Sequence, residues 1–263
     1  MLIRYLLPGK RLKFVKQKFK RWLGDTTIKD DLMKFDKSIC NLENLSVTKS
    51  GNTGLNFSST YCNIYGLNLN VDEYGITAVS NSTVKITDSS LSSSSGRVIY
   101  SRGGVDLEID NTKIIGNTST EAVKLNDGST LQIKESSVSG GRVGISAVYN
   151  STIRLQGGNT ITGNTSEGIY LLNSTIHQYS DAGTTTISSN TGAEINAERS
   201  FLDLSGVTIN GTGGSTEVAL KYGSLLRLGT DSSVSGTINC GSSAPDNGTF
   251  VNDSGTTVTT SGC

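Results

Sequence analysis

The stretch Ser129-Thr-Leu-Gln-Ile133 places a small residue ahead of two apolar residues that alternate with polar ones. This alternation is the period of a β-strand with one buried face. Nine copies of the pattern occur at intervals of 22 to 26 residues, although the copy at Ser174 ends in Gln178. They begin at Ser38, Thr60, Ser82, Val105, Ser129, Ser151, Ser174, Ser200 and Ser224. Such an interval predicts a solenoid, in which each repeat buries its apolar face against its neighbours.

Each repeat has room for two more short strands. Most copies are followed after five or six residues by a second apolar position, as at Leu91, Ile114 and Val138. A third alternating run then leads into the next copy, as in Glu121–Leu125. Gly, Asn, Asp and Ser separate the runs, as turns require. The pattern predicts an all-β parallel β-helix of about nine coils with three strands per coil, since an antiparallel sandwich would show more two-residue hairpin signals and no fixed long period.

The outward position between the two apolar residues supports this register. Coils stack about 4.8 Å apart, so equivalent positions form ladders along the solenoid. Opposite charges adjoin at Lys85/Glu108 and at Asp203/Arg227, and no like charges adjoin in this ladder. Directly stacked like charges would be destabilising, so the predicted alignment is consistent with sheet energetics.

The four cysteines form two pairs that are each one coil apart. Cys40 and Cys62 occupy the same inward position of consecutive copies, and Cys240 and Cys263 are separated by 23 residues. Both pairs are possible disulfides, and both could also be buried free thiols. Their spacing suggests no metal site, and we expect neither a metal nor a cofactor.

The N-terminal segment differs from the repeats in charge. Its first 24 residues hold eight of the 23 basic residues and no acid, which leaves 15 bases against 23 acids in the remainder. The bases are Arg4, Lys10, Arg11, Lys13, Lys16, Lys18, Lys20 and Arg21. Leu12, Val15, Phe19 and Trp22 recur at helical spacing, which predicts an amphipathic helix. Ile28, Leu32, Phe35 and Ile39 predict a second helix behind an N-cap at Asp25 or Thr26.

We therefore divide the chain into a basic helical arm and cap (1–37), a parallel β-helix (38–240) and a terminating coil (241–263). Three roles are open for the arm. It could cover the open end of the solenoid. It could dock onto other subunits through its basic residues and Trp22. It could also lie on an anionic membrane or nucleic acid. The segment does not have the pattern of a signal peptide, and no stretch is apolar enough to span a membrane as a helix.

The sequence offers few catalytic residues. Glu121 and Glu167 begin equivalent third runs two coils apart, hence roughly 9.6 Å at about 4.8 Å per coil. Inverting glycosidases hold their two carboxyl groups about 6.5–9.5 Å apart, so this pair is a weak candidate for glycoside cleavage. The alternative is that both are solvated glutamates beside turns.

The Ser-Thr-apolar-X-apolar copies, joined by Gly-Asn-Thr-Ser turns, resemble right-handed parallel β-helix repeat proteins over about residues 38–240. That group includes pectate-lyase-like enzymes, bacterial adhesins and bacteriophage tailspikes. A short N-terminal attachment segment ahead of a Ser/Thr/Asn-rich helix looks most like a tailspike or tail fibre subunit. That resemblance implies a homotrimer, attachment to other virion proteins through the arm, and contact with a host surface polysaccharide or receptor.

We expect a structural virion appendage that binds a host surface without catalysis and is made in the host cytoplasm without a signal peptide. The alternatives are a polysaccharide lyase or glycoside hydrolase of the same fold, and a bacterial surface adhesin. This chain is short for a tailspike, and its carboxylate pair is a poor match for depolymerase activity.

Overall fold

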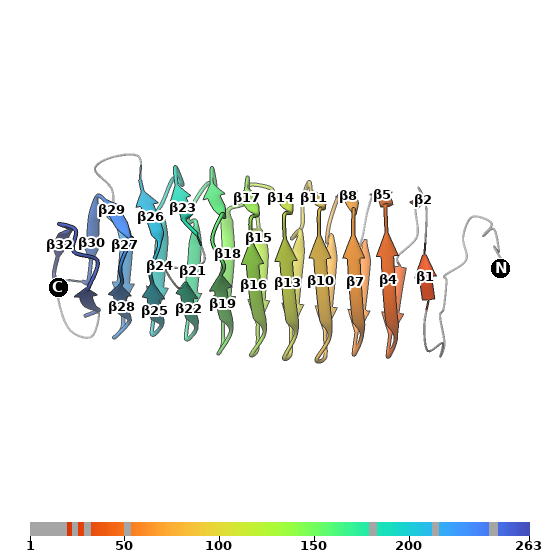
Figure 1. Ribbon diagram of the computed structural model, residues 1–263, viewed down its shortest axis with the longest axis horizontal. Helices are drawn as coiled ribbons and strands as arrows, with labels where there is room; N and C mark the ends of the chain where they lie inside the picture. The colour runs from red at the N-terminus through yellow and green to blue at the C-terminus, as the bar shows by residue number, and fades with distance from the viewer. Residues whose placement is uncertain are drawn as a thin grey trace.

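The computed structural model describes residues 20–22, 26–28, 33–49, 54–178, 183–211, 216–241 and 247–263. These residues form three parallel sheets that run along the long axis of an elongated rod, as Figure 1 shows. Every strand between the first and last of its sheet pairs with its counterparts one coil before and one coil after it. The chain is a parallel β-helix solenoid, as the repeat interval predicts.

We call the sheets A, B and C. Sheet A contains β1 (Lys20–Trp22), β4 (Ile39–Glu43), β7 (Tyr61–Tyr65), β10 (Thr83–Thr87), β13 (Asp106–Asp110), β16 (Thr130–Lys134), β19 (Thr152–Leu155), β22 (Thr175–Gln178), β25 (Phe201–Leu204), β28 (Leu225–Leu228) and β31 (Thr249–Asn252). Sheet B contains β2 (Thr26–Ile28), β5 (Leu45–Lys49), β8 (Asn68–Val71), β11 (Ser90–Ser93), β14 (Lys113–Ile115), β17 (Ser137–Ser139), β20 (Thr160–Thr162), β23 (Thr185–Ser188), β26 (Val207–Asn210) and β29 (Ser233–Ser235). Sheet C contains β3 (Met33–Asp36), β6 (Leu55–Ser58), β9 (Ile76–Val79), β12 (Ile99–Arg102), β15 (Glu121–Asn126), β18 (Val143–Val148), β21 (Ile169–Leu172), β24 (Ile195–Glu198), β27 (Thr216–Lys221), β30 (Thr237–Asn239) and β32 (Thr259–Ser261).

The nine copies of the repeat become nine consecutive strands of sheet A, from β4 to β28. Their register is the one that the sequence predicts, because Lys85 lies opposite Glu108 and Asp203 opposite Arg227. The Lys85 ammonium is paired with the Glu108 carboxylate. One oxygen of Asp203 lies 3.9 Å from Nη1 of Arg227. The predicted charge ladder is confirmed.

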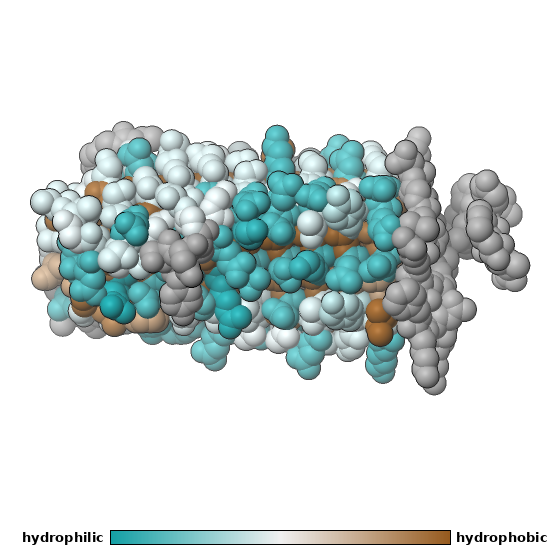
Figure 2. All heavy atoms as spheres, viewed as in Figure 1, coloured by the Kyte–Doolittle hydropathy of each residue, from teal (hydrophilic) through white to brown (hydrophobic). Residues whose placement is uncertain are grey.

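The core is a column of apolar side chains enclosed by the three sheets. Strands of sheet A alternate buried and outward residues, and Phe57 stacks on Phe35 of the preceding coil with ring centroids 5.1 Å apart. Figure 2 shows that the outer face over sheets A and B is largely hydrophilic, with apolar atoms in narrow strips between polar rows. The alternation in the sequence thus separates a dry interior from a polar surface.

The Ser or Thr at the start of most copies is explained by hydrogen bonds between neighbouring coils. In four copies the backbone N–H of this residue donates to the hydroxyl oxygen of its counterpart one coil further on, as from Ser174 to Ser200 at 3.1 Å and from Ser200 to Ser224 at 3.1 Å. Ser174, Ser200 and Ser224 are buried, so the hydroxyls satisfy N–H groups that water does not reach. We call this row the serine ladder.

The predicted N-terminal helices are wrong wherever the structure describes the segment. Lys20–Trp22 and Thr26–Ile28 are strands paired with β4 and β5, and Met33–Asp36 is a strand paired with β6. Met33 and Phe35 are buried while Lys34 and Asp36 are exposed, which is the period of a strand. Pairing with the next coil outweighs the local helical spacing, as tertiary context often does. The three sheets therefore extend across the expected boundary at residue 38.

Candidate functional site

The corner between sheets C and A presents an unusual set of side chains. At the first corner position the backbone adopts positive φ in consecutive coils, and most coils place Ser, Gly, Asp or Asn there. Such conformations are unfavourable for bulky residues. Nevertheless Tyr149, Arg199 and Tyr222 adopt φ values of 56°, 47° and 53°. Together with Asn173 they form one row over four consecutive coils, so the row spans roughly 14 Å at about 4.8 Å per coil.

This row forms one wall of a groove of about 730 Å³. The opposite wall is the start of the strands of sheet A, where Phe201 and Leu225 lie beside Thr175. Tyr149, Phe201 and Tyr222 keep 52%, 40% and 40% of their surface exposed, so their rings are available to a ligand. We call this surface the aromatic groove. Asn150, Asn173 and Thr175 add amide and hydroxyl groups to the lining, whereas the Ser174 hydroxyl is buried in the serine ladder.

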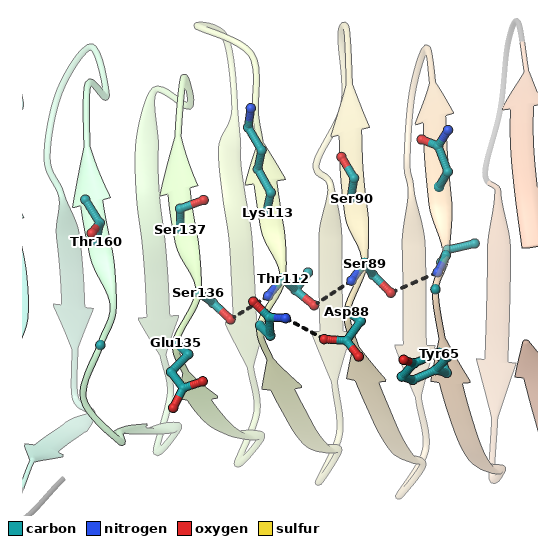
Figure 3. Close-up of a pocket in the computed structure, with 15 residues that line it drawn as sticks. Tyr65, Asp88, Ser89, Ser90, Thr112, Lys113, Glu135, Ser136, Ser137 and Thr160 are labelled. Atoms are coloured by element: carbon teal, nitrogen blue, oxygen red, sulfur yellow. Dashed lines mark hydrogen bonds between the residues drawn. The ribbon is translucent and has the colours of Figure 1, made fainter. Parts of the chain in front are cut away.

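A second groove, of about 700 Å³, follows the corner between sheets A and B. Figure 3 shows Tyr65, Asp88 and Glu135 along one side of it and Ser90, Lys113 and Ser137 along the other. Its floor is another hydroxyl ladder, in which Ser89 N–H donates to Thr112 at 3.3 Å and Thr112 N–H donates to Ser136 at 3.0 Å.

The acidic residues of this second groove are already engaged in part. Asn111 donates its side-chain amide to the Asp88 carboxylate. A hydrogen bond to Asp88 and the negative charge of that carboxylate raise the pKa of Tyr65 above its ordinary value, so this phenol stays protonated at neutral pH. We call this second groove, between sheets A and B, the polar groove.

Glu121 is fixed in a cluster of cations on sheet C. Its side chain is 9% exposed, and its carboxylate oxygens lie 2.9 Å from Nε of Arg97, 3.1 Å from Nζ of Lys124 and 3.5 Å from Nη2 of Arg142. Burial would raise the pKa of Glu121, but a backbone hydrogen bond, Arg97 and Lys124 together lower it below its ordinary value. A carboxyl group held ionised in this way is unsuited to donate a proton as a general acid at neutral pH.

Glu167 lies two coils from Glu121, on the row that runs through Val143. It is half-buried and accepts a hydrogen bond of 3.3 Å from the side chain of Asn196. The structure thus places both glutamates in the predicted row, and it also shows that the ion pairs of Glu121 occupy both of its oxygens. Glu121 is therefore held firmly by its ion pairs, and Glu167 is held more weakly by the hydrogen bond from Asn196.

A second pair of carboxyl groups is buried beneath the corner between sheets B and C. Glu194 and Glu217 are both 0% exposed and stand one coil apart, since Ile195 pairs with Val218. Asn190 donates its backbone N–H to Glu194 at 3.2 Å, and its side-chain amide contacts the other oxygen. Burial and the nearby Glu217 raise the pKa of Glu194 despite these hydrogen bonds. The pair is closed off from solvent, so it belongs to the interior of the solenoid.

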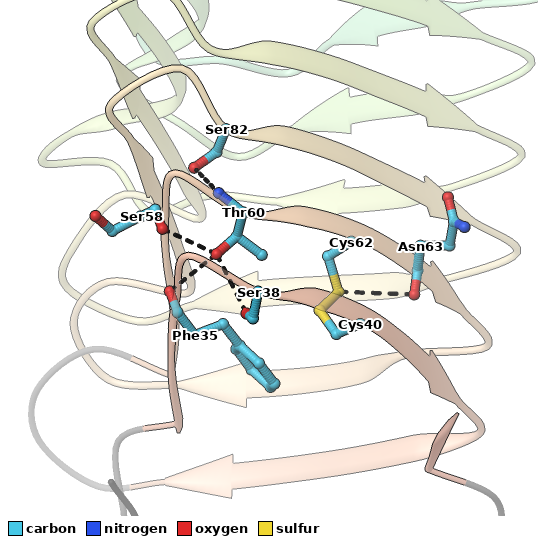
Figure 4. The surroundings of a disulfide bond; sticks show 8 residues. All are labelled: Phe35, Ser38, Cys40, Ser58, Thr60, Cys62, Asn63 and Ser82. Atoms are coloured by element: carbon cyan, nitrogen blue, oxygen red, sulfur yellow. Dashed lines mark hydrogen bonds between the residues drawn. A yellow bond between two sulfur atoms is a disulfide. The ribbon is translucent and has the colours of Figure 1, made fainter. Parts of the chain in front are cut away.

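Both cysteine pairs are disulfides in the structure. Cys40 and Cys62 lie opposite each other in β4 and β7 with Cα atoms 4.6 Å apart, and Figure 4 shows their sulfur atoms inside the coil. Cys240 and Cys263 are joined at the C-terminal end, with Cα atoms 4.9 Å apart. Each bond links neighbouring coils, one near each end of the described solenoid.

The basic arm falls mostly outside the described residues. Arg4, Lys10, Arg11, Lys13, Lys16 and Lys18 lie there, and only the backbone of Lys20, Arg21 and Trp22 is described, as β1. Within the described residues no group of three or more His, Cys, Asp or Glu side chains could hold a metal ion. No helix in those residues is long and apolar enough to cross a membrane.

No family model and no curated protein matches this chain. The solved structure of the A-module of mannuronan C-5 epimerase AlgE4 from Azotobacter vinelandii does match. The TM-score is 0.54, and the match covers 90% of this chain and 88% of that module at 11% sequence identity. The chain shares its fold with an enzyme that modifies a polysaccharide. At this level of identity the likeness shows the fold alone, and nothing in it assigns catalytic residues here.

The sequence does not by itself reveal the aromatic groove. Tyr149, Phe201 and Tyr222 are separated by 52 and 21 positions and belong to no motif. The available signal is positional, because each of the three follows or precedes the serine of a repeat copy by one or two residues. That signal gains meaning only once the corner register is known.

Proposed function

We propose that this chain binds a polysaccharide in the aromatic groove and does not cleave it. The observation that carries this proposal is the convergence of three exposed aromatic rings and several amide and hydroxyl groups on one corner. Sugar rings present apolar faces with hydroxyl groups at their edges. Such a ligand is complementary to rings that supply apolar contact area and to amides that supply directed hydrogen bonds.

The length of the groove fits an extended ligand. The row from Tyr149 to Tyr222 spans roughly 14 Å at about 4.8 Å per coil, and it lies along the side of the rod rather than in a closed cavity. Internal segments of a long polymer can enter such a groove without a chain end. The ion-paired state of Glu121 supports a role in binding without cleavage, because this member of the predicted catalytic pair is held ionised and is unsuited to donate a proton at neutral pH.

Within this proposal the chain is the host-binding part of a virion appendage. Support comes from the Ser/Thr/Asn-rich solenoid and from the eight bases in the first 24 residues, which would attach the protein to other virion proteins. We further propose that the subunit works as a homotrimer assembled through that arm. Contact of the arm with nucleic acid or an anionic membrane is the competing role.

Binding is tested with the variants Tyr149→Ala and Tyr222→Ala on a panel of immobilised bacterial surface polysaccharides. We expect each to weaken binding of the recognised polymer about tenfold, the effect of about 1.4 kcal/mol that one ring in a binding surface typically contributes. Tyr61→Ala is the matched control, because Tyr61 is 49% exposed on sheet A away from the groove. If Tyr149→Ala and Tyr222→Ala bound the polymer as tightly as the parent and Tyr61→Ala do, the groove would not be the binding site.

The second candidate function is a polysaccharide-modifying enzyme, supported by the fold that this chain shares with the epimerase module and by the carboxylates of the polar groove. The same panel distinguishes the two functions. Non-cleaving binding leaves polymer viscosity, reducing ends and sugar configuration unchanged after long incubation. Product formation that is lost in Asp88→Asn or Glu135→Gln would establish the enzyme instead.

The arm is tested by light scattering of the full chain and of a variant lacking residues 1–19. We expect the mass of three subunits for the full chain and of one subunit for the truncated chain. A trimer that persists after truncation would exclude the arm as the assembly element, and a monomeric full chain would contradict the proposed trimer.

A further inference from the structure

Arg199 is a cation placed inside the aromatic groove. Its guanidinium lies over the ring of Tyr222, with Cζ 5.2 Å from the ring centroid, and its backbone is held at positive φ beside Asn173 and Tyr222. Among the residues that the structure describes, no carboxylate forms an ion pair with it. The part of the groove lining that the structure describes contains no acidic side chain.

Several other arginines of the solenoid are paired with carboxylates. Arg97 makes the same kind of contact with Tyr100, at 5.6 Å, but it also lies 2.9 Å from the Glu121 carboxylate. Arg102 pairs with Asp127 at 2.7 Å, and Arg227 pairs with Asp253 at 2.8 Å. Arg97 and Arg199 thus both lie over a tyrosine ring, but Arg97 also pairs with Glu121, whereas no described carboxylate pairs with Arg199.

The geometry leaves the donors of Arg199 available. A guanidinium that lies over a ring keeps the N–H groups of its planar fork for a ligand, and this fork matches the two oxygens of a carboxylate. The ring of Tyr222 restrains the side chain, so less conformational entropy is lost when a ligand binds. Arg199 is the one charged side chain in the described lining, and one cation balances one negative charge.

We propose that the aromatic groove selects an acidic polysaccharide, and that Arg199 binds a sugar carboxylate of the uronic acid type. The inference rests on the proposed function, since it names the class of polymer that the groove takes. The rings supply contact with the sugar backbone, Asn173 supplies hydrogen bonds to hydroxyl groups, and Arg199 supplies the charge. Neutral polymers of the same shape bind more weakly because they leave the guanidinium without its anionic partner.

The test uses polygalacturonate, hyaluronan and alginate, each beside its carboxyl-reduced form, in titration calorimetry at low and at high salt. We expect at least one acid polymer to bind more tightly than its reduced form, and this preference to shrink with added salt. Arg199→Gln is expected to weaken acid binding about tenfold to a hundredfold, the usual contribution of a hydrogen-bonded charge pair, and to remove most of the preference for the acid form over the reduced form.

The control variant is Arg154→Gln. Arg154 is exposed on sheet A outside the groove, so its loss should change neither affinity nor the salt dependence. Both variants keep a long polar side chain, and thermal melts verify that they fold as the parent does. A reduced polymer that binds as tightly as its acid form, or an Arg199→Gln variant with full affinity and salt dependence, would overturn the proposal while the proposed binding function stands. The proposal would likewise be overturned if no acidic polymer bound while a neutral polymer bound in a way that depends on Tyr222. Absence of binding to every polymer would overturn both.

Discussion

Removal of the disulfide between Cys40 and Cys62 is expected to lower the free energy of unfolding by about 3 kcal/mol. The bond closes a loop with a sequence separation of 22, and loop-closure entropy for about that length gives roughly this stabilisation. Coils of a solenoid contact only their neighbours, so the loss should concentrate near the bond rather than spread along the rod. The measurement is urea unfolding of the Cys40→Ala/Cys62→Ala variant, with amide exchange of residues 33–49 as the local readout.

The second disulfide supplies the control. The Cys240→Ala/Cys263→Ala variant should increase exchange in β30 and β32 and leave residues 33–49 as protected as in the parent. Alanine is preferred to serine because Cys40, Cys62 and Cys240 are buried and a hydroxyl there would need a partner. If the first variant exchanged uniformly faster along the whole rod, the disulfide would act on global rather than local stability, contrary to this expectation.

Replacement of Glu121 with Gln is expected to cost about 2 kcal/mol of stability at neutral pH. The substitution leaves Arg97 and Lys124 close together without their shared counter-charge. Breaking a fully buried pair costs about 3–5 kcal/mol, and the smaller value here reflects cations that keep part of their contact with water. The measurement is the free energy of urea unfolding at pH 7.

The stabilisation that Glu121 provides depends on pH. The pKa of Glu121 is lower in the folded chain than its ordinary value of 4.5, so the folded state binds fewer protons than the unfolded state. The stabilisation by Glu121 is therefore fully present above the unfolded pKa and is lost as pH falls through the folded pKa. We expect the stability difference between the parent and Glu121→Gln to be large at pH 7 and to vanish in strong acid.

Glu167→Gln is the matched control, since Glu167 is half-buried and Asn196 is its hydrogen-bond donor in the described structure. We expect it to change stability by less than about 0.5 kcal/mol, as a typical surface substitution does. If the two variants were equally stable and both abolished cleavage of a polysaccharide, the glutamates would be catalytic and the structural role of Glu121 would be wrong.

The sequence predicts the solenoid of this protein well because both the strands and their pairing follow from the repeat pattern. Alternation at Ser129–Ile133 and in the other eight copies specifies a strand, and the interval of 22 to 26 residues specifies the partner of that strand one coil away. The register of Lys85 with Glu108 follows with no further information. Prediction fails at Met33–Asp36, where apolar residues suit a helix and a strand equally well and pairing with β6 decides.

The aromatic groove lies beyond such prediction for a different reason. Tyr149, Arg199 and Tyr222 occupy a corner position that most coils fill with small or flexible residues, and positive φ disfavours them there. Local preferences therefore argue against the arrangement that forms the groove. Bulky residues kept in unfavourable conformations often mark functional positions, and this one becomes visible only when the coils are stacked.

The serine ladder makes successive coils nearly equivalent at their starts, since each hydroxyl serves the N–H of its neighbour whatever lies on the outer corner. A whole coil could therefore be gained or lost between Asn173 and Arg199 without a new type of contact in the interior. Such a change would move Tyr149 relative to Tyr222 by one coil, about 4.8 Å. The distance between the binding rings would then change in steps of one coil. Proteins with more or fewer coils would present ring spacings that match polymers of different repeat length.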